Sequence, residues 1–162
     1  MKRNIFFLLI ILIFSSKITA QDKESNIIIS IDQEVHPAIS NMYILDGLKK
    51  YYISYEPGRF LIKELDLKEL QNNKAQSLKL VLSNNIDCPN SSSSKMYEIE
   101  DFKLSWLDQR YLILNIYNTD NKKYKKIYNP LPGKSYTYDY DYPGGTIKRV
   151  QKSFTKEQKQ CQ

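Results

Sequence analysis

Residues 135–142 have the sequence Ser-Tyr-Thr-Tyr-Asp-Tyr-Asp-Tyr, in which aromatic and small polar side chains alternate without interruption. An alternation with a period of two is typical of a β-strand with two different faces. The four tyrosines therefore share one face of the strand. The pattern leaves open whether that face meets the core, with each hydroxyl group at the rim, or lies exposed as a binding surface.

Strand patterns continue along most of the chain, where β-branched and aromatic runs are separated by clusters of Asn, Asp, Gly, Pro and Ser. The Tyr111–Leu114 run is apolar on both faces and indicates a central strand. Lys50–Tyr55 and Arg59–Lys63 flank a Pro-Gly turn and predict a hairpin. About eight short strands with this spacing predict a mainly β fold, a single antiparallel β-sandwich, with a small β-barrel as the alternative.

Four further predictions concern local structure. Glu64–Gln71 predicts a short helix, Ser83–Lys95 a surface loop and Lys123–Tyr128 a strand. In the strand predicted over Tyr97–Trp106, the apolar phase slips where the charged pair Glu100-Asp101 occurs. A β-bulge at this pair would restore the alternation.

The first 20 residues have the pattern of a secretory signal peptide. Lys2-Arg3 precedes an apolar run, Ile5–Phe14, and Ala20 is a small residue of the kind that a signal peptidase accepts. The run is too short to span a bilayer as a helix, and no cysteine stands at the cleavage position for a lipid anchor. We expect a single β-rich domain of residues 21–162, exported to the periplasm or secreted, without stable membrane insertion.

Charge is unevenly distributed along the expected mature chain, whose net charge is +3. Residues 21–121 hold 11 Lys and Arg against 15 Asp and Glu, whereas residues 122–162 hold 10 against 3. A basic C-terminal quarter can contact an acidic partner, a polyanion or an anionic membrane surface. The interpretation that we favour is that its lysines lie on a turn and an exposed strand, where lysine also discourages aggregation. Nucleic acid is not an expected partner, because the chain is exported and has no zinc-finger or RNA-recognition motif.

Cys88 and Cys161 are the only cysteines of the chain. In an exported protein, an even number of cysteines predicts a disulfide, and two cysteines allow one intramolecular pairing. The bond would close a long loop and contribute about 4 kcal/mol in the chain-entropy model. A free thiol and an intermolecular bridge through Cys161 are the alternatives.

Three segments resemble the later part of fibronectin type III-like sandwiches, within about residues 103–142. They are Lys103–Trp106, the strand Tyr111–Tyr117, and Leu131–Tyr138. In that family a Trp ends an early strand, and a Pro-Gly turn leads to a corner Tyr. The resemblance implies that Trp106 is a core residue and that Tyr136 hydrogen-bonds back to the turn backbone. It implies nothing about activity, because the architecture carries many functions.

The sequence contains no catalytic signature. His36 is the only histidine, which excludes a multi-His zinc site, and its position before Pro37 is typical of an exposed loop. Asp139 and Asp141 share a strand face with a spacing that suits acid–base or calcium chemistry, but alternating aspartates are also ordinary on a solvent face. We therefore expect a protein that is not an enzyme and has no catalytic residues, metal or cofactor.

The least ordinary feature is a set of tyrosines beside the basic cluster. Tyrosines are favoured anchors of protein interfaces and can stack on sugar rings. We predict an exported binding protein that presents a Tyr- and Lys-rich sheet to a protein partner, as an inhibitor, immunity protein or envelope accessory subunit does. The alternative is a carbohydrate-binding module acting on envelope or extracellular glycans. The predicted binding residues are Tyr124, Tyr128, Tyr136, Tyr138, Tyr140, Tyr142, Lys122, Lys123, Lys125 and Lys126.

Overall fold

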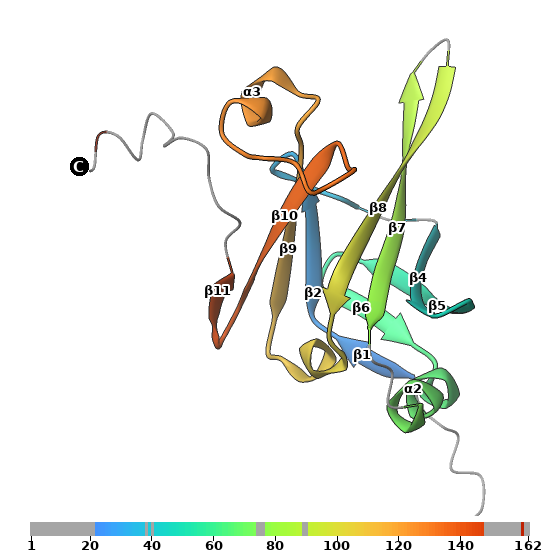
Figure 1. Cartoon of the computed structure of the whole chain (residues 1–162). Helices are drawn as coiled ribbons and strands as arrows, with labels where there is room; N and C mark the ends of the chain where they lie inside the picture. The colour runs from blue at the N-terminus through green and yellow to red at the C-terminus, as the bar shows by residue number, and fades with distance from the viewer. Residues whose placement is uncertain are drawn as a thin grey trace, which may run out of the picture.

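The computed structural model describes residues 22–37, 39, 41–73, 77–88, 91–147 and 160. These residues form two open β-sheets with a common hydrophobic core (Figure 1). The mainly β fold is therefore confirmed. The alternative of a small barrel is wrong for the described strands, because each sheet ends in edge strands. The predicted signal peptide, residues 1–20, and Cys161 lie outside the described residues, so cleavage and the disulfide stay predictions.

The first sheet has six strands in the order β1-β6-β5-β4-β7-β8, and all neighbouring strands are antiparallel. β5 and β6 form the predicted hairpin, in which Gly58 has a φ of 80°, a backbone conformation that favours glycine. The strands are β1 (Lys23–Ser25), β4 (Asn41–Asp46), β5 (Lys49–Glu56), β6 (Arg59–Ile62), β7 (Leu78–Cys88) and β8 (Ser91–Phe102).

The second sheet has five strands in the order β11-β10-β9-β2-β3. Here the prediction of a purely antiparallel sandwich is wrong, because β2 and β9 pair in parallel, from Ile27 opposite Leu112 to Ile31 opposite Ile116. The chain passes from the first sheet to the second at Asn26, so β2 enters the second sheet in the direction of β9. The strands are β2 (Ile27–Ile31), β3 (Glu34–Val35), β9 (Leu112–Asn118), β10 (Tyr136–Tyr142) and β11 (Gly145–Ile147).

In the described part of the chain, three short helices connect strands. Helix α2 (Glu64–Asn72) confirms the predicted short helix and buries Leu67 and Leu70. The 3-10 helix η1 (Leu104–Asp108) follows β8, and the single helical turn α3 (Lys122–Lys125) follows β9. Within the part of the chain that is described, every helix lacks the length and apolar character needed to cross a membrane.

Side chains of both sheets meet in one core. Ile27 and Ile29 of β2 are fully buried. Trp106, on η1, packs between Phe102 of β8 and Tyr140 of β10, with ring centroids 5.4 and 4.4 Å away. The expected core position of Trp106 is thus confirmed. Large aromatic rings remove much apolar surface from water, which is the main favourable contribution to folding.

Two tyrosine hydroxyl groups join the sheets through backbone hydrogen bonds. The N–H of Ile29 in β2 donates to the hydroxyl of Tyr55 in β5 at 2.8 Å. The hydroxyl of Tyr136 accepts the N–H of Glu98 at 2.7 Å and donates to the Glu98 carbonyl at 3.2 Å. Tyr136 therefore contacts edge strand β8 of the other sheet. The family resemblance implied a hydrogen bond from Tyr136 to the turn backbone. This prediction is wrong, because the Tyr136 hydroxyl bonds to the backbone of Glu98 instead.

The β7–β8 hairpin replaces the loop predicted over Ser83–Lys95. The two strands stay paired as far as Cys88 opposite Ser91, and they form an arm beyond the rest of the first sheet (Figure 1). The loop prediction is wrong because the hydrogen bonds between paired strands use backbone N–H and C=O groups, which residues with polar side chains have as well.

The bulge predicted at Glu100-Asp101 is confirmed. Leu78 lies opposite Phe102, but Leu80 lies opposite Ile99, so β8 contains one more residue than β7 in this interval. The extra residue keeps both Ile99 and Phe102 in the core, where each is almost fully buried.

Candidate binding site at the α3 end

Residues 122–126 carry four of the predicted lysines, and they lie on or next to helix α3 instead of the predicted strand. Tyr124 and Tyr128 are four residues apart, a spacing that places both side chains on the same side of the backbone in a strand and in a helix alike. The helix forms because the Asn121 side chain accepts the N–H of Lys123 at 3.0 Å, an N-cap that strands do not use. The Tyr128 N–H then donates to the Tyr124 carbonyl at 2.8 Å.

A tyrosine cluster, Tyr117, Tyr124 and Tyr128, holds α3 against the outer face of the second sheet. Tyr117 on β9 stacks on Tyr128 with ring centroids 4.4 Å apart and an angle of 18° between the planes. Tyr117 also lies 5.5 Å from Tyr124. All three rings are buried. This cluster gives a one-turn helix the tertiary support that so short a helix needs.

The turn between β2 and β3 is bonded to the same region through Asp32, whose φ is 55°. The Asp32 carboxylate accepts the backbone N–H of Asn118 at 2.8 Å and the Asn118 side-chain amide at 3.1 Å. Tyr124 donates its hydroxyl to the Asp32 carbonyl at 2.8 Å. The ammonium group of Lys123 donates to Gln33 at 2.7 Å. These bonds fix the start of α3 relative to β2 and β9.

Asp32→Ala is expected to lower the free energy of unfolding by about 1–3 kcal/mol, because it leaves two Asn118 donors without their acceptor. Urea denaturation, followed by the fluorescence of Trp106, measures the change. Glu34→Ala, at an exposed neighbouring position, is the control and should stay within about 0.5 kcal/mol of the parent chain. Equal stability of the two variants would contradict the role given to Asp32.

The structure places most of the predicted tyrosines inside the molecule. Tyr136, Tyr138 and Tyr140 face the core and are at most 3% exposed. Tyr124 and Tyr128 are buried in the tyrosine cluster, and Tyr142 is half-buried. The interpretation of these rings as an exposed binding surface is therefore wrong. The alternative that the row faces the core is correct.

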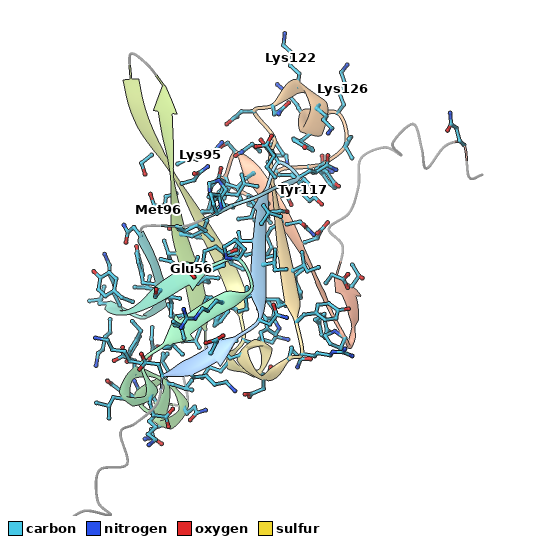
Figure 2. The ribbon with its side chains drawn as sticks, turned by 180° about the vertical axis from the view of Figure 1, so that it is seen from behind. Glu56, Lys95, Met96, Tyr117, Lys122 and Lys126 are labelled. Carbon is cyan, nitrogen blue, oxygen red and sulfur yellow. The ribbon has the colours of Figure 1, made fainter. Side chains whose placement is uncertain are left out.

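The predicted lysines, in contrast, are all exposed. They are Lys122, Lys123, Lys125 and Lys126. Figure 2 shows Lys122 and Lys126 pointing away from the sheets, whereas Tyr117 lies below them on the second sheet. The binding residues that remain from the sequence prediction thus lie at one end of the domain, which we call the α3 end.

A pocket of about 380 Å³ lies beside α3. Its walls come from three segments: the turn after β9, α3 with the residues that follow it, and the loop that leads into β10. The lining residues are Thr119, Asp120, Lys125, Tyr128, Pro130, Lys134 and Ser135.

Two ion pairs connect lining residues of this pocket to strand β8. Lys95 contacts Asp120 at 2.9 Å, and Lys134 forms a short ion pair with Glu98. The hydrogen bond from Lys134 holds the pKa of Glu98 below its usual value, and the same bond raises the pKa of Lys134. The hydrogen bond from Lys95, followed by one from Ser135, lowers the pKa of Asp120. These groups are therefore charged near neutral pH, and the lysines of α3 add positive charge beside them.

The predicted site residues did not include Thr119, Asp120, Lys134 or Ser135. A signal was present, because Thr119-Asp120 follows one predicted strand, whereas Lys134 directly precedes another, which begins at Ser135. β9 and β10 are antiparallel neighbours with Asn118 opposite Tyr136, so these two segments meet at the same end of the sheet. The two segments meet because β9 pairs with β10, and the alternation of residues within each strand does not predict that pairing.

The carboxylates considered for catalysis are bonded to other protein groups. Asp139 is buried and accepts a hydrogen bond from the Asn115 side chain at 2.9 Å, and Asp141 accepts one from Thr146 at 2.9 Å. Among residues with described positions, no group of three or more His, Cys, Asp or Glu is arranged to hold a metal ion.

The α3 end combines ammonium groups with hydroxyl donors, a combination that can bind an anion. Comparisons with family models, curated proteins and solved structures found no match for the chain. The functional proposal therefore depends on the residues of the α3 end themselves.

Proposed function

We propose that this chain is an exported, non-enzymatic binding protein that contacts an acidic surface of a protein partner through the α3 end. The observation that supports this function is the concentration of four exposed lysines on or next to one short, anchored helical turn. Lysines clustered on one surface attract acidic partners and accelerate the encounter by electrostatic steering.

Anchoring makes this arrangement more suitable for binding than the same lysines on a loose loop. The tyrosine cluster and the Asp32 bonds fix the backbone of α3 before any partner arrives. A surface that is already ordered loses less conformational entropy on association, so more of the interaction energy contributes to affinity.

A protein partner is favoured over a glycan because the tyrosine row is buried. Sugar recognition by stacking needs exposed aromatic faces. Among aromatic side chains with described positions in residues 22–147, Tyr52 is the one that is mostly exposed, at 63%, and it lies on β5 and not at the α3 end. A carbohydrate-binding module would therefore have to use hydrogen bonds alone at this site.

The double variant Lys122→Glu, Lys126→Glu is expected to weaken partner binding about tenfold or more, because it reverses two charges at the α3 end. Residues 21–162 are used to capture partners from envelope and secreted fractions at low and high salt, and the affinity of each captured protein is then measured. Capture should weaken at high salt, since salt screens exposed charges.

A matched control is Lys63→Glu, Lys103→Glu, which changes the net charge equally. Both control lysines are exposed, and Lys63 precedes α2 whereas Lys103 precedes η1. These helices lie at the end of the molecule opposite α3 (Figure 1). The control variant should bind nearly as tightly as the parent chain. Equal losses in the two variants would contradict a specific role of α3, and recovery of glycans that stay bound at high salt would support the carbohydrate alternative.

A further inference from the structure

We propose that the pocket beside α3 binds a carboxylate group, so that one Asp or Glu side chain of the partner enters it. This inference rests on the proposed function and assigns a chemical task to the pocket. Lys125 reaches the pocket from α3, and Lys134 reaches it from the loop before β10. Two ammonium groups from different walls are a suitable arrangement for an oxyanion.

Neutral donors complete the lining. Thr119 and Tyr128 bring hydroxyl groups to the same pocket, whereas the Ser135 hydroxyl already donates its hydrogen to Asp120. A carboxylate accepts about four hydrogen bonds through its two oxygens, more than the lysines alone supply. An ammonium group has three donor hydrogens, so the bond from Lys134 to Glu98 leaves further donor capacity on Lys134.

Backbone hydrogen bonds fix the two walls relative to each other. The Thr119 N–H donates to the Ser135 carbonyl at 2.9 Å, and the Leu131 N–H donates to the Tyr136 carbonyl at 2.9 Å. The Lys134 N–H donates to the Leu131 carbonyl at 3.0 Å. The loop that carries Lys134 is therefore bonded at both ends, and the pocket needs little reorganisation to receive a ligand.

The charges around the pocket favour a carboxylate over a phosphate. Asp120 lines the pocket, and Glu98 lies against Lys134. Lys95, Lys125 and Lys134 exceed these two carboxylates by one positive charge, which a singly charged carboxylate balances and a phosphate monoester exceeds. The volume of about 380 Å³ has room for an acidic side chain and its surrounding backbone.

The probe for this proposal is glutamate with both backbone ends blocked, N-acetyl-L-glutamate methylamide, titrated into residues 21–162 and followed by amide NMR shifts. We expect shifts at Thr119, Lys125 and Ser135 with a millimolar Kd. Lys125→Gln with Lys134→Gln should weaken binding about fivefold to tenfold. The matched control Lys63→Gln with Lys103→Gln, at exposed positions that precede α2 and η1, should change the Kd less than about twofold.

Two results of the titration would overturn the proposal. One is the absence of shifts at the pocket, or equal shifts with blocked glutamine, which lacks the charge. The other is tighter binding of inorganic phosphate than of blocked glutamate, which would assign the pocket to a phosphate-bearing ligand.

Partner capture separates this proposal from the proposed function. If the pocket variant captures the partner as well as the parent chain does while Lys122→Glu, Lys126→Glu fails, the function stands and the pocket inference is wrong. If the probe binds in the pocket but no acidic protein is captured, the carboxylate site stands and the proposed protein-binding function is wrong.

Discussion

Tyr138→Ala is expected to lower the free energy of unfolding by about 3–5 kcal/mol, the usual range for removing a large aromatic side chain from a core. Tyr138 is 1% exposed and belongs to the core shared by both sheets. Such a loss is a large fraction of the stability of a typical domain. For a domain of this size it should lower Tm by about 10 °C or more, measured by calorimetry or by circular dichroism.

Tyr52→Ala is the matched control for this prediction. Tyr52 is 63% exposed and its ring is tilted against Tyr43 with centroids 5.9 Å apart, so its removal should cost at most about 1 kcal/mol. Tyr138→Phe keeps the ring and separates the contribution of the hydroxyl group from that of packing. The core position would be refuted if Tyr138→Ala were as stable as Tyr52→Ala and had lost partner binding.

Alkaline pH is expected to unfold the domain cooperatively, because several tyrosines must stay neutral in the core. Burial raises the pKa of Tyr55, Tyr97, Tyr117 and Tyr136 above the usual 10.0. Their neutral form is favoured in the folded state, so this stability is fully present below pH 10.0. Above that pH the unfolded chain releases protons that the folded chain retains, and stability falls with a slope of up to about 1.4 kcal/mol per pH unit for each tyrosine.

The measurement combines urea denaturation at a series of pH values with the ultraviolet absorbance of tyrosinate. The midpoint concentration of urea should decrease steadily above pH 10, and Tyr55, Tyr97, Tyr117 and Tyr136 should ionise together with the loss of structure. Tyr117→Phe removes one of these groups and should make the decrease less steep, even if the variant is less stable at neutral pH. Ionisation of all tyrosines without any loss of stability would contradict their burial.

Several local features could be predicted because their causes lie within a few residues. Pro57-Gly58 predicted the β5–β6 turn, since proline restricts φ and glycine accepts a positive φ. Glu100-Asp101 predicted the bulge, because the phase of the apolar residues changes there. In both places the backbone conformation depends on adjacent residues, so the short-range pattern was sufficient.

The candidate site could be predicted only in part. Both interpretations of the lysines near residue 125 placed them on the surface, and the structure confirms that they are exposed. The helix that carries them was missed, because residues four apart share a side in a strand and in a helix alike. The pocket was missed as well, since Lys134 and Thr119 come together through the pairing of β9 with β10.

Local sequence patterns thus determine that the chain is built mainly from strands, that Tyr136, Tyr138 and Tyr140 share one face of β10, and that the basic residues concentrate in the last quarter. Tertiary structure alone decides that those tyrosines face the core, that β2 pairs in parallel with β9, and that α3 stands beside a pocket. The physical reason is that side-chain alternation is a local property. Which of the two faces is covered depends on elements distant in sequence. In this protein the first sheet covers one face of β10, and the tyrosine cluster under α3 lies beside the other face.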